Sequence, residues 1–147
     1  MKKLSGLVCA LLIVWLTAAT ISPVWAQKKY DKMVAKVKDA YDEGDYIMAA
    51  KYNTKLRKKV KKKLGEGHKY MVTAKMLEAR IALASGMLFD FENKLAEAIE
   101  LSKRVNSEVS VEHALILNEA AALMLQNGNS RQAATYIAKA REIIDKI

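Results

Sequence analysis

The sequence predicts an all-α protein, an α-α superhelix of about three helical hairpins preceded by a signal peptide. Two observations lead to this prediction. After Gln27, apolar residues recur at intervals of three and four, which is the period of an amphipathic helix. Gly44, Gly86 and Gly128 interrupt this pattern at equal intervals along the chain. A fixed period of this length is typical of a solenoid, in which each unit buries its apolar face against a neighbour.

The N-terminal segment, residues 1–26, is a predicted signal peptide and is excluded from the fold. Two lysines precede an uninterrupted apolar run, Leu7–Leu16, and cleavage is expected after Ala26. An uncleaved membrane anchor is the alternative, because Leu4–Ile21 approaches the ~20 residues that span a bilayer. In either case we expect the remaining domain to be exported, to the periplasm or out of the cell.

Charge is distributed unevenly along the 147 residues, whose formal net charge is +9. Lys28 to Arg80 contains 16 basic and 7 acidic residues, whereas the chain from Ile81 onward contains 7 and 9. Any function of the positive charge is therefore expected in the first half. The only cysteine, Cys9, lies inside the apolar run, so the domain at 27–147 is expected to form no disulfide.

The first hairpin is predicted from two helical patterns around Gly44. The first helix is expected from about residue 28 to 42, and Asp45 is expected to cap the second, from about 46 to 64. The inward face of the first helix is expected to hold Tyr30, Met33, Val34, Val37, Ala40 and Tyr41, and that of the second Ile47, Ala50, Leu56, Val60 and Leu64.

The middle hairpin begins after His68 with a pattern that is apolar nearly all round, so this helix is expected to be buried on several sides. Its partner is expected from Asp90, a candidate cap, to Val105. Ser110 is expected to cap the fifth helix.

The last hairpin, from Leu117 to Ile143, carries alanines where two helices would approach closely. These are Ala120, Ala121, Ala133, Ala134 and Ala140, while Leu117, Met124, Ile137 and Ile143 are expected to fill the remaining space. Ile143, Ile144 and Ile147 follow one side of the final helix. We expect this side to dock on a second copy or on a partner.

These features resemble the tetratricopeptide repeat, over the whole of Lys28 to Ile147. The stretch GDYIMAAKY places Gly44, Asp45, Tyr46, Ala49 and Tyr52 in the family's spacing, and Ala121, Gly128, Ala133 and Ala140 hold corresponding places in the third unit. The 42-residue period and the LGEGH connector are similar to the kinesin-light-chain type. Repeats are expected at about 28–67, 68–109 and 110–147. Phe91 departs from the pattern, because the other units have Ala49 and Ala133 there.

The resemblance implies a non-catalytic scaffold whose first helices line a concave groove for a protein or peptide partner. The matching groove positions are Lys38, Tyr41, Met76, Arg80, Leu83, Asn118, Ala122 and Leu125. An amide such as that of Asn118 could hydrogen-bond a peptide backbone. The alternative is that Met76, Leu83 and Leu125 belong to the core.

A basic cluster at the end of the second predicted helix gives the rival function. Seven of nine consecutive residues are cations: Lys55, Arg57, Lys58, Lys59, Lys61, Lys62 and Lys63. Such a patch can attract anionic lipid, a polyanion or an acidic partner protein, or can simply be a solvated face. Nucleic acid is not expected as a partner, because export and the absence of interleaved aromatic residues argue against it.

Nothing in the sequence indicates an enzyme, a cofactor or a metal. His68 and His113 are the only histidines, and capping or packing is the expected role of His68. The acidic run from Asp42 to Asp45 fits a turn with a cap better than a calcium loop. No phosphate-binding loop and no nucleophile with a base at a supported spacing are present.

Overall fold

The computed structural model describes residues 24–147, and all of its regular elements in that range are α-helices, which confirms the all-α prediction. They are α2 (Val24–Asp42), α3 (Tyr46–Lys63), α4 (Lys69–Ala84), α5 (Leu88–Asn106), α6 (Val111–Gln126) and α7 (Ser130–Asp145). The predicted signal peptide lies outside the described residues except for 24–26, which belong to the first turn of α2. None of these six helices is long and apolar enough to cross a bilayer.

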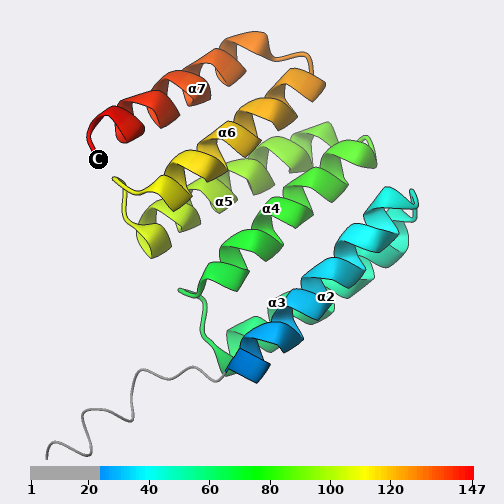
Figure 1. The fold of residues 1–147 in the computed structure, drawn as a ribbon. Coiled ribbons are helices and arrows are strands. Elements are labelled where there is room, and N and C mark those ends of the chain that lie inside the picture. The colour runs from blue at the N-terminus through cyan, green and yellow to red at the C-terminus, as the bar shows by residue number, and fades with distance from the viewer. Residues whose placement is uncertain (1–23) are drawn as a thin grey trace, which may run out of the picture.

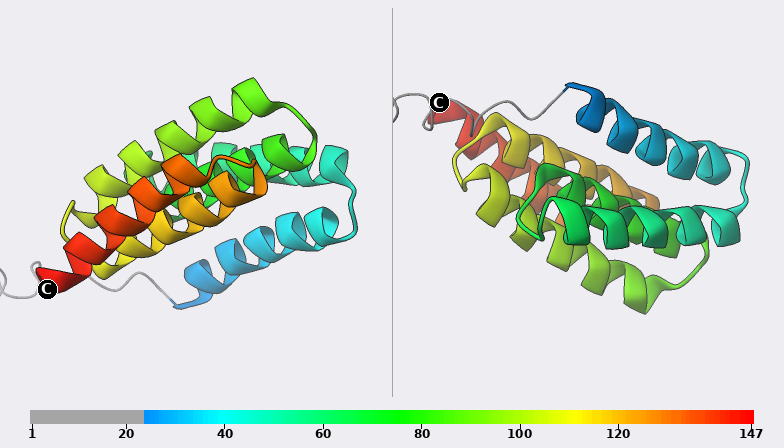
Figure 2. Two further views of the ribbon diagram at one scale, coloured as in Figure 1. Left: turned by 90° about the horizontal axis from the view of Figure 1, so that it is seen from above. Right: turned by 90° about the horizontal axis from the view of Figure 1, so that it is seen from below.

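The helices form three pairs, each joined by a tight turn, and neighbouring pairs pack on one another. Figure 1 shows α2 and α3 at one end, α6 and α7 at the other, and α4 and α5 between them. Each helix contacts the next one in the chain, and α2 also contacts α4. Figure 2 shows the same succession from the two perpendicular sides.

The turns within the three pairs have the same conformation. Gly44, Gly86 and Gly128 have φ values of 78°, 75° and 78°. In the first turn the Gly44 N–H donates to the carbonyl of Tyr41, and the next N–H donates to that of Ala40. The turns at Gly86 and Gly128 repeat both hydrogen bonds at the equivalent positions. This is the Schellman ending of a helix, which requires the left-handed conformation that glycine adopts without strain.

The core divides into one part for the first half of the chain and two for the second. The first part joins α2, α3 and α4 through residues such as Val37, Leu56 and Ala74. The second joins α4 to α7 around Phe91 and Leu95, which are both 0% exposed. A smaller third part, Ala114, Leu117, Ala140 and Ile143, closes the last pair. The middle helix α4 contributes to the first two parts and has nine buried residues, as its apolar pattern predicted.

Phe91 is accommodated at the position where the resemblance expected a small residue. The equivalent residues of the other pairs, Ala49 and Ala133, are 0% exposed, as is Phe91. The larger ring fills space in the second part of the core, beside residues of α4, α6 and α7. The position is therefore interior in all three pairs, whatever the size of its side chain.

Three of the expected caps and turns are confirmed. The Asp45 carboxylate accepts a hydrogen bond from the Met48 N–H at 2.9 Å, and the Ser110 hydroxyl accepts from the His113 N–H at 3.1 Å. His68 caps α4, because its Nδ1 accepts from the Tyr70 N–H at 3.2 Å.

Asp90 as a cap was wrong, because α5 begins at Leu88 and its capping position is occupied by Met87. Asp90 instead lies in the first turn of the helix, where a carboxylate interacts favourably with the helix dipole.

Four residues expected in the interior are exposed. On α3, Ile47 is 85% exposed and Ala50 is also exposed, since the buried stripe of that helix includes Ala49 and Asn53 instead. Asn53 is buried because its amide donates to the Ala74 carbonyl of α4 at 2.9 Å. On α7, Ile137 and Ala134 face outward, and Tyr136 takes the partly buried place against the core.

Candidate functional site

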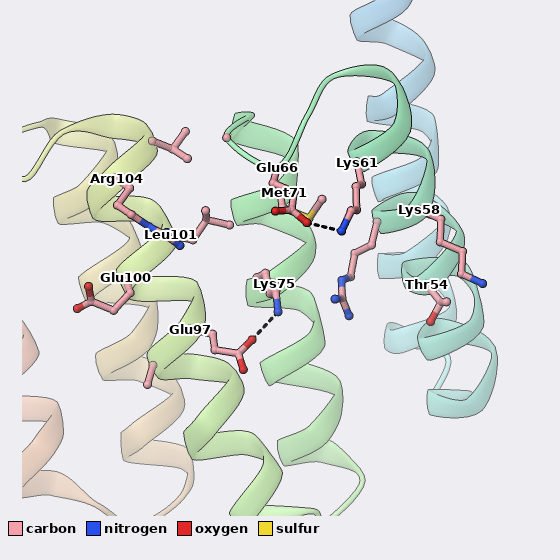
Figure 3. Close-up of a pocket in the computed structure, with 14 residues that line it drawn as sticks. Thr54, Lys58, Lys61, Glu66, Met71, Lys75, Glu97, Glu100, Leu101 and Arg104 are labelled. Atoms are coloured by element: carbon pink, nitrogen blue, oxygen red, sulfur yellow. Dashed lines mark hydrogen bonds and ion pairs between the residues drawn. The ribbon is translucent and has the colours of Figure 1, made fainter.

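The largest hollow in the described part of the chain is an open groove between α3 and α5, with α4 beneath it. We call it the α3–α5 groove. It encloses about 1040 Å³. It is lined by Thr54, Arg57, Lys58, Lys61, Glu66, Gly67, Met71, Lys75, Ala96, Glu97, Glu100, Leu101, Arg104 and Val105. Figure 3 shows side chains from α3, α4 and α5 converging on this space.

The floor of the α3–α5 groove is apolar and its walls are charged. Met71 of α4 and Leu101 of α5 are 5% and 9% exposed, and Val105 lies half-buried beside them. Five basic and three acidic side chains surround this floor. A groove with this distribution suits an extended chain that has both apolar groups and carboxylates.

Ion pairs across the helices shape the α3–α5 groove. The guanidinium of Arg57 lies 2.6 Å from the carboxylate of Glu78, which also lies 3.4 Å from the ammonium of Lys94. One carboxylate of α4 thus ties α3 to α5. Lys75 of α4 donates to Glu97 of α5, as Figure 3 shows.

The pairs alter the pKa of their carboxyl groups in the direction expected for salt bridges. The hydrogen bond from Lys75 lowers the pKa of Glu97, and that from Lys61 lowers the pKa of Glu66. Lys61 and Glu66 are 68% and 67% exposed and 2.5 Å apart, so this pair contributes little to stability. Such a surface pair can be exchanged for a carboxylate of a ligand at small cost.

Two cations of the α3–α5 groove make no ion pair with any residue of the described chain. They are Lys58 of α3 and Arg104 of α5, both exposed. The Nε of Arg57 is buried and has no hydrogen-bond partner within residues 24–147. The groove therefore offers donors that its own carboxylates leave without a partner.

The predicted basic cluster is divided by the structure between the groove and the outer surface. Arg57, Lys58 and Lys61 line the α3–α5 groove. The other four members are exposed on α3 away from it: Lys55, Lys59, Lys62 and Lys63. Lys75 and Arg104 belong to the groove but not to the cluster, because they come from separate segments that only the packing of α4 and α5 brings to it.

The eight positions assigned to a groove along the first helices differ widely in exposure. Lys38, Asn118, Ala122 and Leu125 are exposed, and Tyr41, Arg80 and Leu83 are half-buried. Met76 is 2% exposed and belongs to the core, while Leu83 packs against that core. The guanidinium of Arg80 donates to Glu119 of α6 at 2.7 Å.

The two histidines serve the fold. Burial lowers the pKa of both. His113 is 4% exposed, and its Nδ1 lies 3.0 Å from the hydroxyl of Ser102 on α5. Near the start of α4, the hydroxyl of Tyr70 donates to the carboxylate of Asp31 at 2.5 Å, and burial together with this bond raises the pKa of Tyr70 to about 12. Among residues 24–147, no three His, Cys, Asp or Glu side chains lie together as a metal site would require.

Comparison with protein-family models found no match, and comparisons with curated proteins and with solved structures found none either. The assignment of a function therefore rests on the groove and the surfaces of the chain itself.

Proposed function

We propose that this chain is a non-catalytic binding module that holds an acidic segment of a partner protein in the α3–α5 groove. The observation that carries the proposal is the meeting of five cations from three helices around an apolar floor. Carboxylates of the partner would contact Lys58 and Arg104, and its apolar side chains would lie on Met71 and Leu101. Arginine binds carboxylates with paired hydrogen bonds, and charge complementarity provides specificity.

The α3–α5 groove is favoured over a groove along α2, α4 and α6. On those first helices Arg80 is already engaged with Glu119, and Met76 is part of the core. Lys58 and Arg104 carry no such partner in the described chain. A ligand carboxylate would gain a contact there without displacing an existing pair.

We also propose that the three pairs are stacked repeats of the tetratricopeptide type and that the protein is exported. The equal spacing and identical hydrogen bonds of the three glycine turns support the repeat. The positive start and apolar run within residues 1–26 support export to the periplasm or out of the cell.

The second candidate is an anionic surface, either a membrane or a polyanion, bound through the outer side of α3. It is favoured by the exposure of Lys55, Lys59, Lys62 and Lys63 outside the groove. Cations near a surface of this kind contribute additively and without a defined pocket. The two candidates therefore depend on different lysines of the same helix.

Two charge-reversal variants distinguish them. The groove variant is Lys58→Glu, Lys61→Glu and Arg104→Glu, and the matched control is Lys55→Glu, Lys59→Glu and Lys62→Glu, which changes the net charge equally. Fluorescence anisotropy measures binding of a labelled peptide with six glutamates, and of its six-glutamine counterpart. Circular dichroism checks that both variants keep their helices.

The groove variant should weaken binding of the glutamate peptide at least about tenfold, and the control should change it by much less. The glutamine peptide should bind weakly to all forms, and added salt should weaken the glutamate complex. Equal loss in the two variants would contradict the groove. Binding of phosphatidylserine vesicles that is lost only in the control would favour the second candidate.

A further inference from the structure

Two isoleucines of α7 are exposed at positions that are buried in the preceding pair of helices. Ile137 is 49% exposed, whereas Leu95, the residue at the equivalent position of α5, is 0% exposed. Ile144 is 50% exposed, whereas its equivalent on α5, Ser102, is 0% exposed. The positions on α5 are covered because α6 packs on that helix, with the ring of His113 against the Ser102 hydroxyl.

The first pair follows the same rule. Asn53 and Val60 of α3, at the equivalent positions, are 2% and 0% exposed. Here α4 provides the cover, and the amide of Asn53 donates to the carbonyl of Ala74 on that helix. On α3 and α5 these two positions thus form the seat for the first helix of the next pair.

The exposed side of α6 continues this surface. Asn118 is exposed and Leu125 is 54% exposed, whereas the equivalent Met76 is 2% exposed and Leu83 is packed against the core. We define the end face as Asn118 and Leu125 of α6 with Ile137 and Ile144 of α7. It is the surface onto which a helix packs in the other two pairs, and it is predominantly apolar.

The opposite end of the chain is finished differently. On α2, the positions that would contact a preceding pair carry Lys29, Lys32 and Lys36, all exposed. The residues equivalent to the first two on α4, Met71 and Ala74, are buried in the first part of the core. These lysines make a polar start face, of the kind that closes a stack of helices and prevents further packing.

We propose that two copies of this chain associate through their end faces, related by a two-fold axis. A second copy presents the same apolar surface, as an isologous interface requires. A head-to-tail arrangement would instead place Ile137 and Ile144 against the lysines of the start face, which would have to lose water without gaining partners. The α3–α5 groove stays open in this dimer, because none of its lining residues lies on α6 or α7.

Sedimentation of the full chain over about a hundredfold range of concentration tests the proposal. The end-face variant is Ile137→Lys with Ile144→Lys. The matched control is Ile47→Lys with Phe89→Lys, since these residues are 85% and 82% exposed and lie outside the end face. The segment 1–23 is the same in every sample, so any association through it is common to all.

The wild type and the control should sediment as dimers, with no larger species. The end-face variant should be monomeric, with its dissociation constant raised at least about a hundredfold, because each isoleucine contact corresponds to about tenfold or more. A monomeric wild type, an end-face variant that associates like the wild type, or growth beyond dimers would each overturn the proposal. Circular dichroism must show equal helix content in the variants.

Discussion

The guanidinium of Arg80 on α4 donates to the carboxylate of Glu119 on α6 at 2.7 Å, linking the second and third pairs of helices. The same guanidinium lies 6.0 Å from the ring centre of Tyr41 on α2. A single side chain of the middle pair therefore contacts both outer pairs. Its removal should affect how the three pairs hold together.

Alanine substitution of Arg80 and Glu119 should give a coupling energy of about 0.2–1 kcal/mol in a double-mutant cycle. The value is small because the two side chains are 33% and 34% exposed. Arg80→Ala should cost more than Glu119→Ala, since it also removes the contact with Tyr41. Urea unfolding measures the free energies, with Arg131→Ala as a control on an exposed cation of α7. Independent, additive costs would contradict the link.

Acidification should destabilise the chain through His113. Burial lowers the pKa of this histidine below its ordinary value of 6.5, although Glu108 acts in the opposite direction. As pH falls below 6.5, the unfolded chain binds a proton that the folded chain resists. The free energy of unfolding should therefore drop by up to ~1.4 kcal/mol per pH unit, until the folded pKa is reached.

Urea unfolding between about pH 7.5 and 5.5 measures this dependence above the range where carboxyl groups titrate. His113→Gln should reduce the slope, because it removes the titrating ring and keeps a polar group near Ser102. The remaining slope should come from His68, whose pKa is lowered in the same direction. A slope that is unchanged in His113→Gln would show that the ring does not control the effect.

Removal of the α3 cap should be costly, and removal of the carboxylate that does not cap should not. Asp45→Ala leaves the Met48 N–H without its acceptor and should cost about 1 kcal/mol of unfolding free energy. Asp90→Ala should cost less, because Asp90 lies within the first turn of α5 and makes no capping bond. Equal costs for the two substitutions in thermal or urea unfolding would contradict the assigned helix start.

Gly128→Ala should destabilise the last pair through its backbone alone. The glycine has φ of +78°, and a Cβ there would meet no atom within 4 Å. The left-handed conformation should cost alanine roughly 1 kcal/mol. Gly67→Ala is the control, because it has equal space and no positive φ, and it should cause no loss. Unfolding midpoints that fall equally in both would refute the conformational explanation.

The sequence allowed the all-α class, the glycine turns and two side-chain caps to be predicted, because each depends on residues a few positions apart. The interior face of α3 was harder. Asn53 replaces Ile47 there because its amide meets a carbonyl on α4, in a separate helix of the next pair. The α3–α5 groove was out of reach for the same reason. Lys75 and Arg104 join Arg57 only through the packing of three helices.

The order in which the helices contact one another also has a kinetic consequence. Most contacts join helices that are adjacent in the chain, so little loop entropy is lost before they form, and folding should be rapid. The middle helix α4 is held by α2, α3 and α5, whereas α7 is held chiefly by α6. Backbone amides should therefore exchange with solvent fastest in α7 and slowest in α4, as the structure opens from its ends before it unfolds globally.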